Sequence, residues 1–168
     1  MPGIDAFAPL CTRLGSRRTN FEEGPILSDL TEITGLVHAY ARRLDSGDFD
    51  GVAALFERAV WRSPDRVEVI EGSGAIRRIY DGVHVYDDGT PRTKHLLTNL
   101  TIDIDESGTE AASHCYVTVI QGIMPGDPIN IVLSAQYVDK FAKTEGTWHF
   151  TERSMKSDLT GDLSQHYG

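Results

Sequence analysis

One short segment of the sequence combines a histidine with apolar neighbours in the pattern of a β-strand. Residues 93–99 read TKHLLTN, so alternation places His95, Leu97 and Asn99 on one face of the expected strand. A histidine beside apolar residues is a candidate general base, because imidazole gains and loses a proton near neutral pH. The simpler alternative is a half-buried residue whose ring hydrogen-bonds a backbone carbonyl. His95 is therefore the first candidate for chemistry, and Asn99 is a candidate for the lining of a pocket.

A phenol and a carboxylate stand five residues apart near the end of an expected helix. Apolar residues recur at helical spacing from Leu27 to Leu44, and Tyr40 belongs to this stripe. Asp45 lies at the edge of the stripe and at the C-terminal end of the helix, where the helix dipole disfavours an acid. The alternative is a carboxylate exposed to water. The unfavourable position favours a functional role for Asp45.

An arginine follows two aromatic residues near the end of the sequence. Alternation places Arg153 on the strand face opposite Trp148 and Phe150, together with Met155. Such an arginine either extends to solvent or points into a cavity, where it would hold an anion. Met155 and Trp61 are further candidates for the lining of a pocket.

The first part of the chain is expected to be mainly helical. A long helix is predicted to begin at Ser28 or Asp29 and to end near Gly47, and Asp29 with Glu32 has the spacing of a capping box. Asp48 can then cap a short second helix. Two short strands at 59–61 and 66–70 and helical spacing over 73–86 complete this part.

The second part of the chain predicts strands alone, separated by turn-forming residues. Helices followed by strands are typical of an α+β domain with helices packed on one face of a largely antiparallel sheet. The predicted strands are 94–105, 111–122, 130–143 and 147–158.

Length and composition describe one domain that can enclose a pocket. The chain has 168 residues, of which 40% are hydrophobic, and this suffices for one core without disulfides or a structural metal. Residues 1–24 lack periodicity and are expected to form a flexible arm, which leaves 25–168 as the domain. Cys11 and Cys115 lack metal-ligand spacing, so free thiols in a reducing compartment are expected.

Charge and motifs exclude several classes of function. The formal net charge of -9 disfavours nucleic acids and anionic membranes as partners, because both are polyanions. No apolar run approaches the roughly 20 residues that cross a bilayer, and no signal peptide is evident, so a cytoplasmic location is expected. The sequence has no phosphate-binding loop, serine elbow or zinc motif, and its six histidines form no closely spaced pair. No metal ligand is assigned, and a metal site assembled from distant strands stays the alternative.

The order of three segments resembles the SnoaL-like branch of the NTF2-like superfamily. These segments are YARRLDSGDFDGVAALF at 40–56, TKHLLTN at 93–99 and GTWHFTERSMKSDLTGD at 146–162. The resemblance extends from about residue 27 to residue 160. It implies a cone-shaped α+β barrel, in which a curved, mostly antiparallel sheet wraps round the N-terminal helices and leaves an apolar pocket open at one end.

The resemblance also implies which residues act. The most similar catalytic patterns are those of bile acid 7α-dehydratase, scytalone dehydratase and hexachlorocyclohexane dehydrochlorinase, which eliminate water or HCl with a His-Asp dyad. The matching positions here are His95 and Asp45. The tyrosine that precedes the aspartate corresponds to Tyr40, and the arginine of the last strand to Arg153. A second histidine, used by scytalone dehydratase, would correspond to His114.

These correspondences imply a cofactor-independent lyase that uses no metal. His95 would remove a proton from a carbon next to a carbonyl, and Asp45 would stabilise the resulting imidazolium. Tyr40 would protonate the leaving group or stabilise an enolate, while Arg153 would hold a carboxylate or polarise a carbonyl. The expected substrate is a small hydrophobic polycyclic, steroid-like or aromatic-derived molecule. The alternatives are an isomerase or polyketide-cyclase-type enzyme with the same base, and a non-catalytic binding or assembly subunit like the β subunit of ring-hydroxylating dioxygenases.

One structural observation would separate these alternatives. A hydrogen bond between the side chains of Asp45 and His95 beside an enclosed cavity would favour an enzyme. The resemblance also implies a homodimer or higher homo-oligomer that pairs through the exposed face of the sheet. Candidates for that face are Val117, Val119, Val132 and Val138.

Overall fold

The computed structural model describes residues 25–64, 68–123, 126 and 128–168. The expected arm at 1–24, with Cys11, lies outside the described residues, and so does the start of the strand expected at 66–70. No helix in the described part of the chain is both long and apolar enough to cross a membrane.

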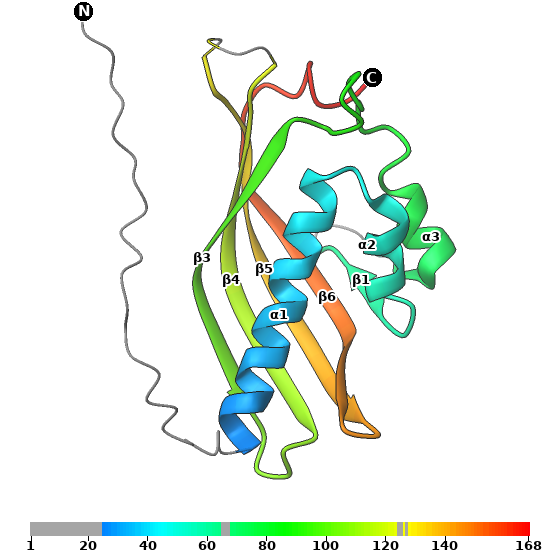
Figure 1. Cartoon of the computed structure of the whole chain (residues 1–168), viewed down its shortest axis with the longest axis vertical. Helices are drawn as coiled ribbons and strands as arrows, with labels where there is room; N and C mark the ends of the chain where they lie inside the picture. Colours follow the sequence, from blue (N-terminus) through cyan, green and yellow to red (C-terminus); the bar gives the residue numbers. More distant parts are fainter. Residues whose placement is uncertain (1–24, 65–67, 124–125, 127) are drawn as a thin grey trace, which may run out of the picture.

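The described residues form an open six-stranded sheet with helices on one side (Figure 1). The strand order is β2-β1-β6-β5-β4-β3, and every neighbouring pair is antiparallel except β1 with β6. The α+β class is confirmed, but among the described residues β2 and β3 each pair on one side only, so the described sheet does not close into a barrel. The elements are α1 (Pro25–Asp45), α2 (Phe49–Leu55), β1 (Val60–Arg62), β2 (Ile70–Glu71), α3 (Ser73–Arg78), β3 (Thr93–Ile104), β4 (Glu110–Gln121), β5 (Asn130–Thr144) and β6 (Thr147–Thr160).

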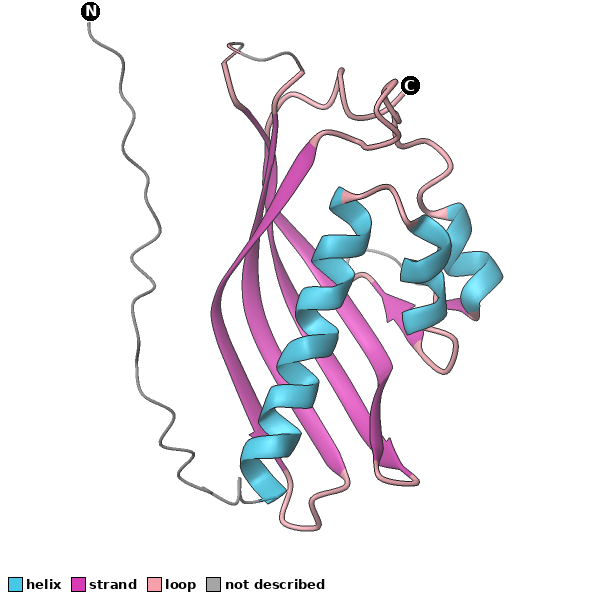
Figure 2. Ribbon diagram, viewed as in Figure 1, coloured by secondary structure: helices cyan, strands magenta, loops and turns pink. Residues whose placement is uncertain are grey.

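The four long strands curve round α1, and α2 and α3 lie beside the end of the sheet that carries β1 (Figure 2). All four strand predictions are confirmed to within two residues at each end. The helical prediction over 73–86 was too long, because α3 ends at Arg78 and is followed by turns.

The long helix begins before the expected capping box. α1 begins at Pro25, and proline suits a first helical turn because its missing N–H would have no partner there. Asp29 accepts hydrogen bonds from Lys143 Nζ at 2.6 Å and Trp148 Nε1 at 3.0 Å. Glu32 accepts one from the backbone N–H of Trp148 at 3.0 Å. The capping-box prediction was therefore wrong, since both acids fasten α1 to the β5–β6 hairpin instead.

The end of α1 is set by a turn at Gly47. Gly47 has a φ of 76°, a conformation that favours glycine, and its N–H donates to the carbonyl of Leu44 at 3.0 Å. A Cβ atom at Gly47 would collide with the carbonyl oxygen of Gly89. Asp48 then caps α2 as predicted, because its side chain accepts from the N–H of Gly51 at 2.9 Å. Two tight constraints thus fix the chain just after Asp45.

Two β-bulges change which side chains face the helices. On β3 the register shifts after Thr98, and Asn99, with a φ of 55°, is exposed and does not continue the face of His95. On β6 one extra residue follows Phe150, so Arg153 joins Phe150 and Trp148 on the buried face. Alternation placed Arg153 opposite these two rings, and that prediction was wrong because a bulge reverses the period of two.

The core lies between α1 and the inner face of the sheet. Of the four valines expected on the exposed face of the sheet, three lie in this core and one lies outside it. Val117, Val119 and Val132 are buried in the core, so their assignment to the exposed face was wrong. Val138 is exposed on the outer face, in register with His114. The homodimer stays a prediction.

Substitution of Gly47 by alanine should destabilise the protein by more than the same change at Gly108. Both glycines have positive φ, but nothing lies within 4 Å of a Cβ at Gly108, while a Cβ at Gly47 meets the backbone of Gly89. We expect Gly108→Ala to lower the free energy of unfolding by about 1–2 kcal/mol and Gly47→Ala to lower it by about 1–3 kcal/mol more. Urea denaturation of the two variants measures both values, and equal losses would contradict the collision.

Candidate active site

The side chains of Asp45 and His95 meet where α1 ends against the first strand of the long hairpins. His95 Nδ1 lies 2.6 Å from Asp45 Oδ1, and the two side chains are only 9% and 13% exposed. The backbone N–H of His95 donates to Oδ2 at 3.0 Å, and the hydroxyl of Thr93 donates to Oδ1 at 2.9 Å. Three donors therefore hold the carboxylate. Because Nδ1 carries the proton that faces Asp45, the other ring nitrogen, Nε2, is left as a proton acceptor.

The carboxylate of Asp45 is ionised at neutral pH. Burial raises the pKa of Asp45. The hydrogen bonds and charge of His95, with the hydroxyl of Thr93, lower the pKa and together outweigh the effect of burial. The net pKa is below the ordinary value for an aspartate. An ionised carboxylate bound to the ring stabilises a positive imidazolium, so the pair has the electrostatics of a general base.

His95 borders a cavity of about 160 Å³ between α1, the sheet and the C-terminal segment. A cavity of about 150 Å³ is enough to hold one benzene ring, so this space fits a single-ring ligand. The predicted site residues Tyr40, Trp61 and Met155 all line it. Further ring-bearing side chains in the wall are Phe49, Tyr80, Tyr137, His166 and Tyr167.

Four tyrosines, Tyr40, Tyr80, Tyr137 and Tyr167, lie in this largely apolar wall. Tyr40 packs edge-on against Tyr137 at 5.6 Å and against His95 at 6.3 Å between ring centroids. Burial, and then the neighbouring Tyr40, raise the pKa of Tyr80 and of Tyr137 well above the ordinary value. These two hydroxyls therefore stay protonated and can donate hydrogen bonds. The hydroxyl of Tyr80 is buried and has no partner in the described structure.

Arg153 lies in the core and not in the cavity wall. Its Nε and Nη2 donate to the two carboxylate oxygens of Asp139, each at 2.7 Å, and both side chains are fully buried. The guanidinium stands over the rings of Tyr40 and Tyr137, 4.0 and 4.4 Å from their centroids. Burial lowers the pKa of Arg153, but the charge and hydrogen bonds of Asp139 raise it overall. Asp139 therefore binds two of the three guanidinium nitrogens, while Nη1 is buried and has no partner in the described structure. The role of Arg153 toward a substrate anion stays a prediction.

The structure also separates two predicted substrate contacts from the cavity. Asn99 is exposed at the bulge of β3. His114 lies on the outer face of the sheet, where its Nε2 is 3.2 Å from the side-chain oxygen of Gln136. Neither residue lines the cavity. Strand alternation could not place them, because the bulge displaces Asn99 and the face of β4 depends on its neighbours.

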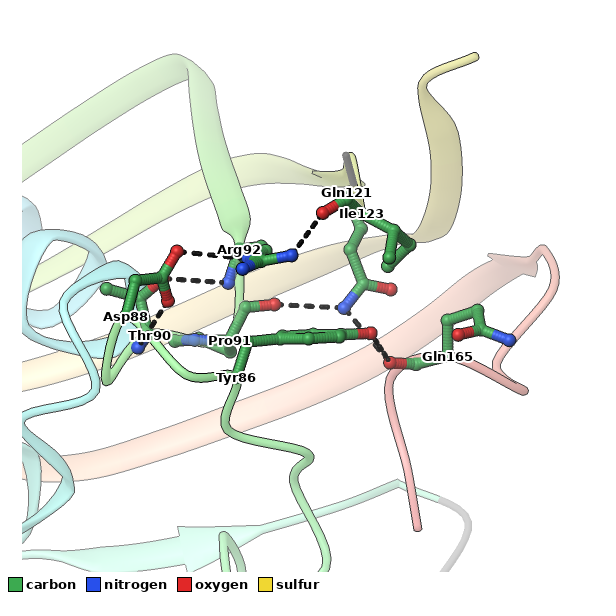
Figure 3. A network of polar contacts seen from close by, with 8 residues as sticks. All are labelled: Tyr86, Asp88, Thr90, Pro91, Arg92, Gln121, Ile123 and Gln165. Atoms are coloured by element: carbon green, nitrogen blue, oxygen red, sulfur yellow. Dashed lines mark hydrogen bonds and ion pairs between the residues drawn. The ribbon is translucent and has the colours of Figure 1, made fainter. Parts of the chain in front are cut away.

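The C-terminal segment, residues 161–168, forms part of the cavity wall and was not predicted to contribute. The carbonyl of Gln165 accepts hydrogen bonds from Tyr86 Oη at 2.7 Å and from Gln121 Nε2 at 3.2 Å (Figure 3). Gln121 Nε2 also donates to the carbonyl of Pro91 at 2.9 Å. This places His166 in the wall. Residues 161–168 have no periodicity that would predict this position in the wall. The only signal in the sequence is the presence of ring-bearing residues after the last strand.

Comparison with known proteins agrees with this architecture. A family model described as a SnoaL-like domain matches residues 25–154, and the chain belongs to this family. No curated protein sequence matches the chain.

Within the part of the chain that the structure describes, no group of three or more His, Cys, Asp or Glu side chains could hold a metal ion.

Solved structures share the fold at low identity. An NTF2-like protein with a cystatin-like fold from Novosphingobium aromaticivorans is 21% identical, with a TM-score of 0.65 over 79% of this chain and 84% of that chain. A candidate scytalone dehydratase from the same organism is 25% identical, with a TM-score of 0.63 over 81% and 88%. A hexachlorocyclohexane dehydrochlorinase from Novosphingobium barchaimii is 16% identical, with a TM-score of 0.63 over 86% and 97%, and shares the fold alone.

Removal of either partner of the buried ion pair between Arg153 and Asp139 should destabilise the protein strongly, whereas removal of both charges should destabilise it less. We expect Arg153→Met and Asp139→Leu each to lower the free energy of unfolding by about 3–5 kcal/mol, because each leaves one buried charge unpaired. The double variant should lose less than the sum of the two. The exposed pair of Arg43 and Asp48 is the control, and Arg43→Met should cost less than about 1 kcal/mol. Additive losses in urea denaturation would argue against a coupled pair.

Asp45 should stabilise the protein more at neutral than at acid pH. Because its pKa is lower in the folded chain, the folded state binds fewer protons than the unfolded state, whose aspartate pKa is about 3.9. The stabilisation is complete above that unfolded value and disappears as pH falls through the lower folded value. The stability difference between wild type and Asp45→Asn, measured by thermal melting, should therefore shrink on acidification. A difference that is independent of pH would contradict this.

Proposed function

We propose that this chain is a cofactor-independent lyase that catalyses a dehydratase-type β-elimination with His95 as the base. The observation that carries the proposal is the short contact of 2.6 Å between Asp45 and His95, with the histidine ring bordering an apolar cavity. A non-catalytic subunit has no need for an ionised carboxylate held by three donors behind a histidine. The 25% identity to a candidate scytalone dehydratase supports the same class of reaction.

In the proposed reaction, Nε2 of His95 takes a proton from a carbon next to a carbonyl of the substrate. The electron pair of that C–H bond forms the new double bond as the hydroxyl on the neighbouring carbon leaves. The imidazolium, stabilised by Asp45, gives its proton to the departing hydroxide, so water is released and the base is restored. The hydroxyls of Tyr40 and Tyr80 stabilise the charge that develops on the carbonyl oxygen.

The cavity favours a neutral, aromatic-derived or alicyclic substrate with a single ring. Its volume of about 160 Å³ suits one ring, whereas drug-sized ligands occupy pockets of roughly 300–1,000 Å³. No lysine or arginine of the described chain lines it, and Arg153 is bound to Asp139. Of the expected substrate classes, a polycyclic or steroid-like molecule would extend beyond this volume.

Substitution of His95 should remove activity without unfolding the protein. We expect His95→Gln to lower turnover by about 10²- to 10⁴-fold, the usual contribution of a general base, with stability within about 1–2 kcal/mol of wild type. His114→Gln, on the outer face of the sheet, is the matched control and should keep activity within about twofold. Turnover is measured from enone absorbance with cyclic β-hydroxy ketones of one ring.

Two results would overturn the proposal. One is a His95→Gln variant that retains wild-type turnover. The other is turnover that gives an isomer of the substrate without loss of water, because this would assign the same base to an isomerase. Mass spectrometry of the product separates elimination from isomerisation, since only elimination lowers the mass by that of water.

A further inference from the structure

The backbone of the C-terminal segment, rather than its histidine side chain, holds the segment in place. The carbonyl of His166 accepts from the N–H of His84 at 2.8 Å, and the N–H of Gly168 donates to the carbonyl of Gly82 at 3.2 Å. The carbonyl of Gln165 takes two side-chain hydrogen bonds, from Tyr86 and Gln121 (Figure 3). The imidazole of His166 makes none of these contacts.

The imidazole of His166 is nevertheless buried at the cavity. The residue is 8% exposed and lines the same cavity as His95. Its Nδ1 is buried and has no hydrogen-bond partner in the described structure. Buried polar atoms nearly always have a partner, so this imidazole keeps hydrogen-bonding capacity that no group of the described structure uses.

The ring of His166 is neutral at neutral pH. Burial, and then the charge of His95, lower the pKa of His166 below its ordinary value. A neutral imidazole offers one N–H donor and one acceptor, and neutral histidine can polarise a carbonyl by donating its hydrogen bond. The cavity wall that contains His166 also includes Tyr40, Tyr80, Tyr167 and His95.

We propose that His166 binds the carbonyl oxygen of the substrate by a hydrogen bond from its imidazole and so orients the substrate toward His95. This inference rests on the proposed function, in that it takes the cavity as the substrate site. His166 is then a substrate-binding residue that sets specificity for an oxygen-bearing ring. It acts from a different wall from Tyr40, which is carried by α1.

The test compares two ligands of the same shape, cyclohexanone and methylenecyclohexane, which differ only in the oxygen atom. His166→Phe keeps a ring of similar size and removes both nitrogens. We expect this variant to lower the ratio of cyclohexanone to methylenecyclohexane affinity by about tenfold, as for the loss of one hydrogen bond. The control is His114→Phe, since His114 lies on the outer face of the sheet and does not line the cavity, and it should leave the ratio unchanged. Ligand-observed NMR measures both affinities.

A second measurement uses the wild-type protein and does not depend on the folding of a variant. The ring ¹⁵N resonances of His166, assigned from their loss in His166→Gln, should move on addition of cyclohexanone and not of methylenecyclohexane. Equal loss of both affinities in His166→Phe would show a packing role and overturn the proposal. The proposal would also be overturned if both affinities stayed at their wild-type values, if the resonances did not move, or if the wild-type protein failed to bind cyclohexanone.

These outcomes are distinct from failure of the lyase proposal. Neither ligand can undergo β-elimination, so the affinity ratio reports the contact alone. A chain without lyase activity that still discriminates through His166 would remove the reaction and keep the contact. An active lyase whose His166→Phe variant keeps the wild-type ratio would remove the contact and keep the reaction.

Discussion

The buried ion pair between Arg153 and Asp139 is the constraint on which the interior depends. Two charged side chains with no exposed surface lie on neighbouring strands, joined by two hydrogen bonds of 2.7 Å. Leaving either charge unpaired in such a place is costly, so the partners fix the register of β5 against β6. The guanidinium in turn lies under the rings of Tyr40 and Tyr137, which line the cavity. The shape of the candidate site therefore depends on an interaction between two residues that do not line the cavity.

The dyad is positioned from two independent directions. The turn at Gly47 ends α1 and holds Asp45 in place, while β3 brings in Thr93 and His95. The carboxylate is bound by the backbone of β3 as well as by two side chains, so helix and strand are tied at this point. The imidazole of His95 is thus placed by regular elements, which position side chains more rigidly than loops do.

Much of the fold, and part of the site, could be predicted from the sequence. The long strands follow from alternation between turn signals, and the relation of His95 to Asp45 follows from the resemblance to the family. The face of Arg153 could not be predicted, because a single inserted residue on β6 reverses the alternation. His166 could not be predicted either, because its place in the wall depends on long-range backbone contacts in a segment without regular structure. Local patterns thus specify elements, while bulges and tertiary contacts decide which side chains meet.

The bulge on β3 has a consequence for the behaviour of the protein in solution. β3 is a free edge of the sheet, and a long flat edge with unpaired backbone groups is a template for pairing with another chain. At Asn99 the backbone adopts a φ of 55° and the ladder with β4 is interrupted, which breaks the regular spacing of donors and acceptors along that edge. The irregularity that displaces Asn99 therefore makes this edge a poorer template for pairing with another chain.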